Sequence, residues 1–193
     1  MEQNENLITK TAKLAVFLVQ EYLKDGAFAI DATCGNGNDT IALSRMVGPS
    51  GRVLAMDVQG EALKTTEERL REQGIGNVEL VRDSFVRMEA YCRERKPSAV
   101  VFNLGYLPGG DHEITTTAEV TLEGLRAALR ILRPGGIAAV TMYSGHPAGE
   151  EEKQSVLAFA EALPKREYHA AYVQMLNQKG HPPEILWITK KIS

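Results

Sequence analysis

The sequence predicts an α/β fold in which a mostly parallel seven-stranded sheet carries helices on both faces and one antiparallel strand. Short apolar runs alternate with longer segments of helical periodicity through most of the 193 residues. Such alternation is typical of parallel strands joined by right-handed crossover helices. The last two apolar runs, residues 168–176 and 185–190, are joined by a connection too short for a crossover helix. These two runs must therefore pair antiparallel, which places a reversed strand near one edge of the sheet.

The first predicted element is a helix. Over residues 7–23 apolar side chains recur at helical spacing, and the pattern stops at Asp25-Gly26. We expect residues 1–25 to form an N-terminal helix that covers the sheet, within a single domain of residues 1–193.

Strands and helices then alternate, and the boundaries between them carry turn signals. One example is Arg133-Pro134-Gly135-Gly136, a stop signal for the helix that precedes it. The predicted strands span residues 27–30, 52–56, 78–81, 99–102, 137–143, 168–176 and 185–190, and the later helices span residues 39–46, 60–72, 85–94, 117–132 and 150–163.

The composition predicts one globular protein. Hydrophobic residues make up 44% and charged residues 24% of the chain, which is ordinary for a folded domain. The apolar stretch at residues 14–19 is too short to span a bilayer and lacks a signal-peptide cleavage site, so we expect a cytoplasmic protein with no membrane partner. The two cysteines, Cys34 and Cys92, form neither a disulfide framework nor a zinc-ligand spacing, and no metal site is predicted.

Residues 31–39, D-A-T-C-G-N-G-N-D, are the most informative stretch. An apolar run precedes this stretch and a helix-like segment follows it. The pattern therefore predicts a strand, a ligand-binding loop and a helix N-terminus. Gly35 and Gly37 allow the backbone to turn tightly and to approach a bound molecule, toward which the free N–H groups of the helix start point. An adenosine-containing cofactor is the first prediction.

Charge indicates which cofactor binds. A dinucleotide pyrophosphate is an anion, yet Asp31 and Asp39 flank the loop, and Thr40 stands where a third glycine would complete the dinucleotide motif. S-adenosyl-L-methionine carries a sulfonium and an ammonium beside one carboxylate, so it can use carboxylates and helix N–H donors together. We therefore predict this cofactor, with contacts in the loop from Asp31, Gly35, Asn36, Gly37, Asn38, Asp39 and Thr40.

Polar residues also follow the next three predicted strands, at the carboxyl ends where ligands bind in parallel sheets. Asp57 follows the second strand, where an acid can accept hydrogen bonds from two ribose hydroxyls. Asp83 follows the third strand and is predicted to meet the adenine edge. The cofactor contacts predicted at these strand ends are Asp57, Gln59, Asp83, Ser84, Asn103 and Leu104.

Four segments resemble one known family. They are I-D-A-T-C-G-N-G-N-D-T at residues 30–40, D-V-Q at 57–59, N-L-G-Y-L-P-G-G-D-H at 103–112 and Y-S-G-H-P at 143–147. From residue 7 on, the chain is similar to the small bacterial "putative rRNA methylase" family of class I methyltransferases, part of which is understood as tRNA 5-aminomethyl-2-thiouridine methyltransferase. The resemblance implies a Rossmann-like fold and methyl transfer from S-adenosyl-L-methionine to the exocyclic amine of 5-aminomethyl(-2-thio)uridine at the tRNA wobble position.

The residue chemistry is compatible with an amine acceptor. Asn103 resembles the first residue of the D/N-P-P-Y motif of amino-group methyltransferases, although Leu104-Gly105 replace the prolines here. Tyr106 is predicted to stack on the base, with a half-buried packing role as the alternative. Gly109-Gly110 would let a lid move over the acceptor.

Asp111 and His112 are the best acid/base candidates, because an alkylammonium must lose a proton before it can attack. A solvated loop histidine is the alternative for His112, and His146 is predicted to line the substrate mouth. The predicted catalytic residues are thus Asn103, Tyr106, Asp111 and His112, and the predicted substrate contacts are Tyr106, Gly109, Gly110, His112 and His146.

Charge is the main argument against an RNA substrate. The chain has 22 Lys and Arg against 25 Asp and Glu, a net charge of −3 and a pI of about 5.9, unlike a sequence-independent RNA binder. Binding a tRNA anticodon arm therefore needs a local basic face, or a homodimer that joins two basic patches. The candidates are Lys10 and Lys13, then Arg126, Arg130 and Arg133, then Lys165, Arg166 and Lys179, each of which could equally be a solvated face.

Three classes of function remain open. The first is the tRNA wobble-uridine methyltransferase. The second is an rRNA methyltransferase or a small-molecule methyltransferase with the same cofactor, and the acidic pI favours the small-molecule form. The third is a nicotinamide-dependent oxidoreductase or a binding module on the same fold. Asp39 and the polar loop after the fourth strand disfavour this third class.

Overall fold

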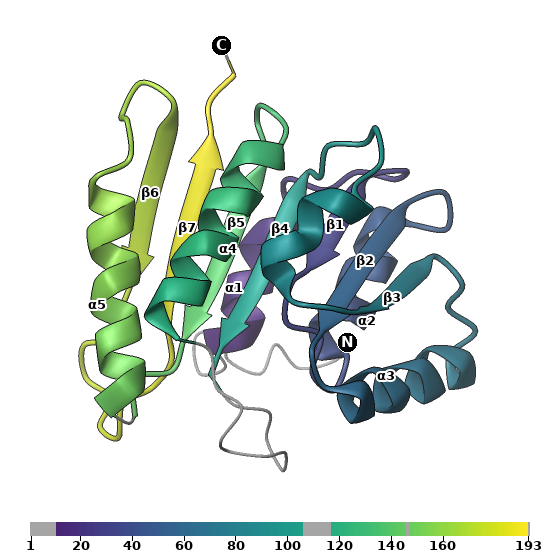
Figure 1. Ribbon diagram of the computed structural model, residues 1–193, viewed down its shortest axis with the longest axis horizontal. Helices are drawn as coiled ribbons and strands as arrows, with labels where there is room; N and C mark the ends of the chain where they lie inside the picture. Colours follow the sequence, from purple (N-terminus) through teal and green to yellow (C-terminus); the bar gives the residue numbers. More distant parts are fainter. Residues whose placement is uncertain (1–10, 106–116, 146, 193) are drawn as a thin grey trace.

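The computed structural model describes residues 11–105, 117–145 and 147–192. Within these residues a seven-stranded sheet has the strand order β3-β2-β1-β4-β5-β7-β6 (Figure 1). All neighbouring strands from β3 to β5 pair parallel. Strand β7 runs antiparallel to both of its neighbours, β5 and β6. The predicted fold, including one reversed strand near the edge, is therefore confirmed.

The elements alternate as the sequence predicts, with boundaries shifted by a few residues. The strands are β1 (Phe28–Asp31), β2 (Arg52–Asp57), β3 (Val78–Arg82), β4 (Ala99–Leu104), β5 (Ile137–Met142), β6 (Tyr168–Val173) and β7 (Glu184–Lys190). The helices are α1 (Thr11–Gln20), α2 (Asn38–Val47), α3 (Gly60–Glu72), the 3₁₀ helix η2 (Phe85–Tyr91), α4 (Ala118–Ile131) and α5 (Pro147–Glu161).

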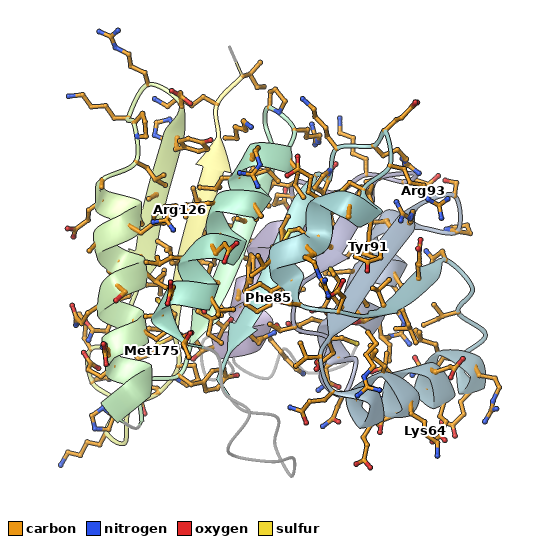
Figure 2. The ribbon with its side chains drawn as sticks, in the orientation of Figure 1. Lys64, Phe85, Tyr91, Arg93, Arg126 and Met175 are labelled. Carbon is orange, nitrogen blue, oxygen red and sulfur yellow. The ribbon has the colours of Figure 1, made fainter. Side chains whose placement is uncertain are left out.

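The core lies on both faces of the sheet, since the central strands β1 and β5 are buried along their whole length. On one face, Phe102 of β4 meets the ring of Phe85 edge-on, with the centroids 5.6 Å apart. Gly124 of α4 lets this helix approach closely, because a Cβ there would lie 2.4 Å from the Phe85 ring, which Figure 2 shows between η2 and α4. On the other face, α1 covers the sheet, and the indole of Trp187 donates a hydrogen bond to the Ala15 carbonyl (3.2 Å).

Two predicted elements differ in the structure. The helix predicted over residues 85–94 is a short 3₁₀ helix, because Ser84 caps its start and Arg93, just after it, has a left-handed φ of 54°. The predicted strand 168–176 ends at Val173, so the predicted hairpin connection to the last strand begins three residues earlier than the apolar pattern indicates. The first predicted helix begins in residues outside those described.

This topology brings the ends of β1, β2, β4 and β5 and the start of β7 to one edge of the sheet, called the carboxyl edge below. Loops and helix N-termini that can bind a ligand gather at this edge. Among the helices of the described ranges, none is long and apolar enough to cross a membrane.

Candidate active site

The loop after β1 is held against the end of β2. The backbone N–H of Cys34 donates to the Met56 carbonyl (2.8 Å), and that of Gly35 donates to a carboxylate oxygen of Asp57 (2.8 Å). Gly37 precedes α2 with a φ of 77°, and a Cβ there would lie 2.6 Å from the Thr66 hydroxyl. Only glycine fits this turn without strain, and the preceding residues Gly35 and Asn36 remain partly exposed beside the N-terminus of α2.

Asp57 lies at the tip of β2, where the sequence predicts it. One carboxylate oxygen accepts from the N–H of Gly35 and the other accepts from the N–H of Gln59 (2.9 Å). A carboxylate has further lone pairs, so Asp57 can hold the loop and still accept hydrogen bonds from a ligand.

Asp31 lies behind the loop. Its side chain is fully buried and accepts hydrogen bonds from the Thr40 hydroxyl (2.6 Å) and the Thr33 N–H (3.2 Å). Burial, together with the nearby charge of Asp39, raises the pKa of Asp31 to about 7. Asp31 and Thr40 therefore position the loop from the inside and have no surface on the cleft.

Asp31 should link stability to pH. Its pKa in the folded protein, about 7, lies above its ordinary value of 3.8, so between these values the folded state holds a proton that the unfolded chain has released. The stabilisation from this proton is complete below the ordinary pKa and is lost as the pH rises through the folded pKa. Chemical denaturation across this window should show a smaller fall in unfolding free energy for Asp31→Asn than for the natural protein. Equal falls in both proteins would contradict the assignment.

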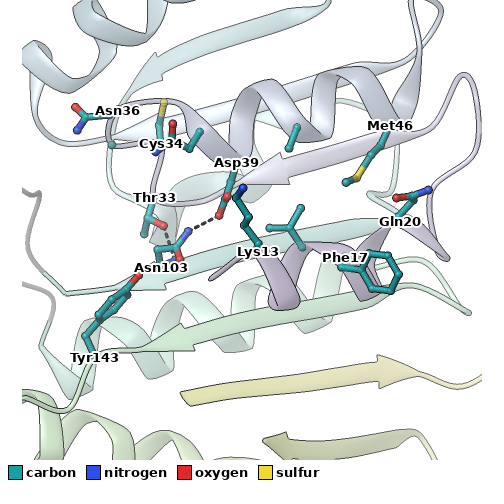
Figure 3. A pocket seen from close by; sticks show the side chains of 14 residues that line it. Lys13, Phe17, Gln20, Thr33, Cys34, Asn36, Asp39, Met46, Asn103 and Tyr143 are labelled. Carbon is teal, nitrogen blue, oxygen red and sulfur yellow. Dashed lines mark hydrogen bonds between the residues drawn. The ribbon is translucent and has the colours of Figure 1, made fainter. Parts of the chain in front are cut away.

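A cleft of about 700 Å³ opens beside this loop and extends between α1 and α2 (Figure 3). At the carboxyl edge it is lined by the loop and by the ends of β4 and β5. Away from this edge, the helices contribute Phe17 and Met46, and Phe17 is half exposed. The lining residues at the carboxyl edge are Thr33, Cys34, Gly35, Asn36, Asn38, Asp39, Asn103 and Tyr143.

Asn103 and Asp39 form the polar centre of the cleft, as Figure 3 shows. The Asn103 side-chain amide donates to a carboxylate oxygen of Asp39 (2.5 Å), and its backbone N–H donates to the Thr33 hydroxyl (2.7 Å). Burial raises the pKa of Asp39, while the hydrogen bond from Asn103 opposes this shift. An ionised carboxylate only accepts, so the NH₂ of Asn103 must face Asp39 and its oxygen must point away. This oxygen is buried and has no partner among the described residues.

A family model described as "Putative rRNA methylase" matches residues 53–189. The chain belongs to this family. It is 39% identical to the chloroplastic tRNA (mnm(5)s(2)U34)-methyltransferase of Arabidopsis thaliana, over 90% of this chain and 67% of the plant protein. It is also 33% identical to a demethylmenaquinone methyltransferase of Staphylococcus carnosus, but over only 60% of this chain and 43% of that protein.

Solved structures agree with this membership. A "putative rRNA-methylase" from Clostridium thermocellum has a TM-score of 0.89 at 36% identity, covering 94% of this chain and 97% of that one. A methyltransferase from Streptococcus mutans was solved in complex with SAH (S-adenosylhomocysteine). It has a TM-score of 0.84 at 35% identity, covering 93% of this chain and 97% of that one. The protein is thus an S-adenosylmethionine-dependent methyltransferase, and its donor cofactor is S-adenosyl-L-methionine.

Not every predicted site residue of this methyltransferase lines the cleft. The carboxylate of Asp83 accepts from the Tyr91 hydroxyl and the Ser84 N–H, both at 2.7 Å, and from Arg87, and these bonds lower its pKa. Leu104 is fully buried. The predicted residues Tyr106, Gly109, Gly110, Asp111, His112 and His146 lie outside the described residues.

The cleft also includes residues that the sequence reasoning did not place at the site. Lys13, Phe17 and Gln20 share one face of α1, a helix predicted to cover the sheet, with Lys13 as part of a candidate basic face and not as a cleft residue. Their spacing of three or four residues could have marked this face, but the apolar periodicity hid it. Tyr143 follows β5, and burial with the charge of Asp39 raises its pKa.

Proposed function

We propose that this methyltransferase acts on the exocyclic primary amine of 5-aminomethyl(-2-thio)uridine at the tRNA wobble position. The observation that carries the proposal is the unpartnered amide oxygen of Asn103, which Asp39 holds facing away from itself in the cleft. A buried acceptor of this kind suits an N–H donor such as a substrate amine. The name of the Arabidopsis relative, a tRNA (mnm(5)s(2)U34)-methyltransferase, supports the same substrate class.

The chemistry requires positioning and charge stabilisation. When bound, the cofactor supplies an electrophilic methyl carbon, and in the reaction its C–S bond breaks as the N–C bond forms. The Asn103 oxygen would accept a hydrogen bond from the amine, which aims the lone pair and stabilises the positive charge that grows on nitrogen. Asp39, which accepts the hydrogen bond from the Asn103 amide, would add a negative charge next to Asn103. Asp111 or His112 would take the amine proton, and Tyr106 would stack on the base.

An assay on paired tRNAs tests this proposal. The protein should methylate tRNA that carries 5-aminomethyl-2-thiouridine and leave unchanged the same tRNA with an unmodified wobble uridine. Equal methylation of both tRNAs would contradict the amine assignment. Turnover on ribosomal RNA alone would favour the rRNA alternative.

A small-molecule methyltransferase is the second candidate, because the net charge of −3 disfavours RNA and a relative of that class matches part of the chain. Turnover on a free amine, with none on tRNA, would decide for it. We also propose that the protein is cytoplasmic and that it forms a homodimer, which would present two basic patches to the anticodon arm.

Lys13 has the only positive charge among the described residues that line the cleft. We propose that it binds the carboxylate of the cofactor's methionine moiety. Lys13→Gln should then weaken SAH binding severalfold, as expected for an exposed charge-assisted hydrogen bond, and leave methylthioadenosine, which lacks that carboxylate, unaffected. Calorimetry with both ligands is the measurement, and Lys24→Gln is the matched control. Equal weakening of both ligands would show that Lys13 acts elsewhere.

A further inference from the structure

Tyr143 brings a second polar group to the part of the cleft that holds Asn103. Both residues line the active-site cleft. Asn103 on β4 pairs with Thr141 on β5, and residues two apart along an extended chain point to the same face of a sheet. Tyr143 therefore lies on the Asn103 face, with the two Cα atoms about 8 Å apart. Figure 3 shows the Tyr143 side chain extending toward Asn103.

The surroundings of Tyr143 hold its ring and keep its hydroxyl neutral. The backbone of Gly105 lies against the ring, with a φ of 146°, and a Cβ at Gly105 would be 3.6 Å from the Tyr143 side chain. Burial and the charge of Asp39 raise the pKa of Tyr143, so the phenol stays protonated at neutral pH. Because the side chain is 39% exposed, its own proton can face water while its oxygen accepts a hydrogen bond.

Two oxygen acceptors thus line one part of the cleft. The Asn103 amide oxygen is buried and has no partner among the described residues. The other acceptor is the Tyr143 hydroxyl. A neutral primary amine has two N–H groups and one lone pair. Two acceptors can hold both N–H groups and leave the lone pair directed at the methyl carbon.

We propose that the Tyr143 hydroxyl accepts the second N–H of the substrate amine and thereby limits the enzyme to one methyl transfer. This inference rests on the proposed amine acceptor. In the first transfer the nitrogen lone pair forms the N–C bond, the sulfur keeps the electron pair of the broken C–S bond, and the nitrogen releases one proton. The neutral product has a single N–H, which Asn103 can hold.

A second transfer would leave the Tyr143 hydroxyl without its partner. The new methyl group would occupy the position of the lost N–H and would shield the hydroxyl from water. A site built to bind an N–H group rejects an analogue that lacks it, because the polar group of the site is left unpaired. The natural protein should therefore prefer the primary amine over the secondary amine by roughly 100-fold in kcat/KM.

The test uses the full chain with S-adenosylmethionine and two tRNAs, which carry 5-aminomethyl-2-thiouridine or 5-methylaminomethyl-2-thiouridine. The kcat/KM for methyl transfer is measured on both. Tyr143→Phe keeps the ring beside Gly105 and removes only the hydroxyl. In this variant the preference for the primary amine should fall roughly tenfold, and 5-dimethylaminomethyl-2-thiouridine should accumulate. SAH affinity should be unchanged.

Tyr172→Phe is the matched control, because Tyr172 is 40% exposed but lies on β6, outside the cleft. Its preference should equal that of the natural protein. Rapid dimethylation by the natural protein, or an unchanged preference in Tyr143→Phe, would overturn the role of Tyr143 and leave the proposed function standing. A Tyr143→Phe protein that binds SAH but methylates neither tRNA would also overturn this role. No methylation of either tRNA by the natural protein would overturn the proposed function as well.

Discussion

Replacing Asn103 by alanine should lower kcat for methyl transfer by about 10²- to 10³-fold while SAH affinity stays within a few fold. The reason is that the substitution removes the unpartnered amide oxygen proposed to receive the amine, a contact that strengthens as charge develops. The loop that holds the cofactor keeps its anchors to Asp57 and Met56. Single-turnover kinetics and calorimetry measure the two quantities separately.

The matched control is Asn177→Ala, which changes an asparagine in the hairpin bonded only to Gln178 among the described residues. Its kcat should be unchanged. A loss of SAH affinity in Asn103→Ala as large as the loss in kcat would show that Asn103 holds the cofactor and does not hold the acceptor.

Replacing Asp57 by alanine should weaken S-adenosylmethionine binding by about 2–3 kcal/mol, because a charge-assisted pair of ribose hydrogen bonds is lost. The same change removes the carboxylate that accepts hydrogen bonds from the backbone N–H groups of Gly35 and Gln59. The loop after β1 should therefore also become more mobile. Calorimetry on a folded variant is the measurement. Methylthioadenosine, which keeps the ribose, should lose as much affinity as SAH.

Glu61→Ala is the control for this prediction, since Glu61 is an exposed acid in the first turn of α3, close to Asp57 in sequence. It should leave the affinity unchanged. Unaltered S-adenosylmethionine binding in Asp57→Ala would mean that the ribose lies elsewhere.

The fold could be predicted because its signals are local. Alternating apolar runs mark buried parallel strands, and the short connection before β7 leaves antiparallel pairing as the only option. The ligand-binding loop after β1 could also be predicted, since Gly37 occupies a turn that requires a left-handed φ. The 3₁₀ form of η2 could not be predicted, because it depends on the Ser84 cap and on the backbone conformation of Arg93.

The site was only partly predictable, because hydrogen-bond partners far apart in sequence decide which polar group faces a ligand. Asp31 and Asp39 look alike in the loop, yet one lies behind it and the other lines the cleft. The basic stripe on α4 shows the same limit. Arg126 lies over the Phe159 ring, Arg130 pairs with Glu89, and Arg133 donates to Ser98 and to the Tyr22 carbonyl. Arg126 and Arg130 nonetheless remain exposed, so the RNA-binding face predicted from their spacing stays a prediction.

The central claim is that the acceptor is the aminomethyl nitrogen of the wobble uridine. It is tested most directly by nucleoside analysis of tRNA from cells with and without the gene for this protein. We expect 5-methylaminomethyl-2-thiouridine in the first tRNA and 5-aminomethyl-2-thiouridine in its place in the second, with restoration by the natural protein but not by Asn103→Ala. An identical wobble nucleoside in both cell lines would contradict the claim.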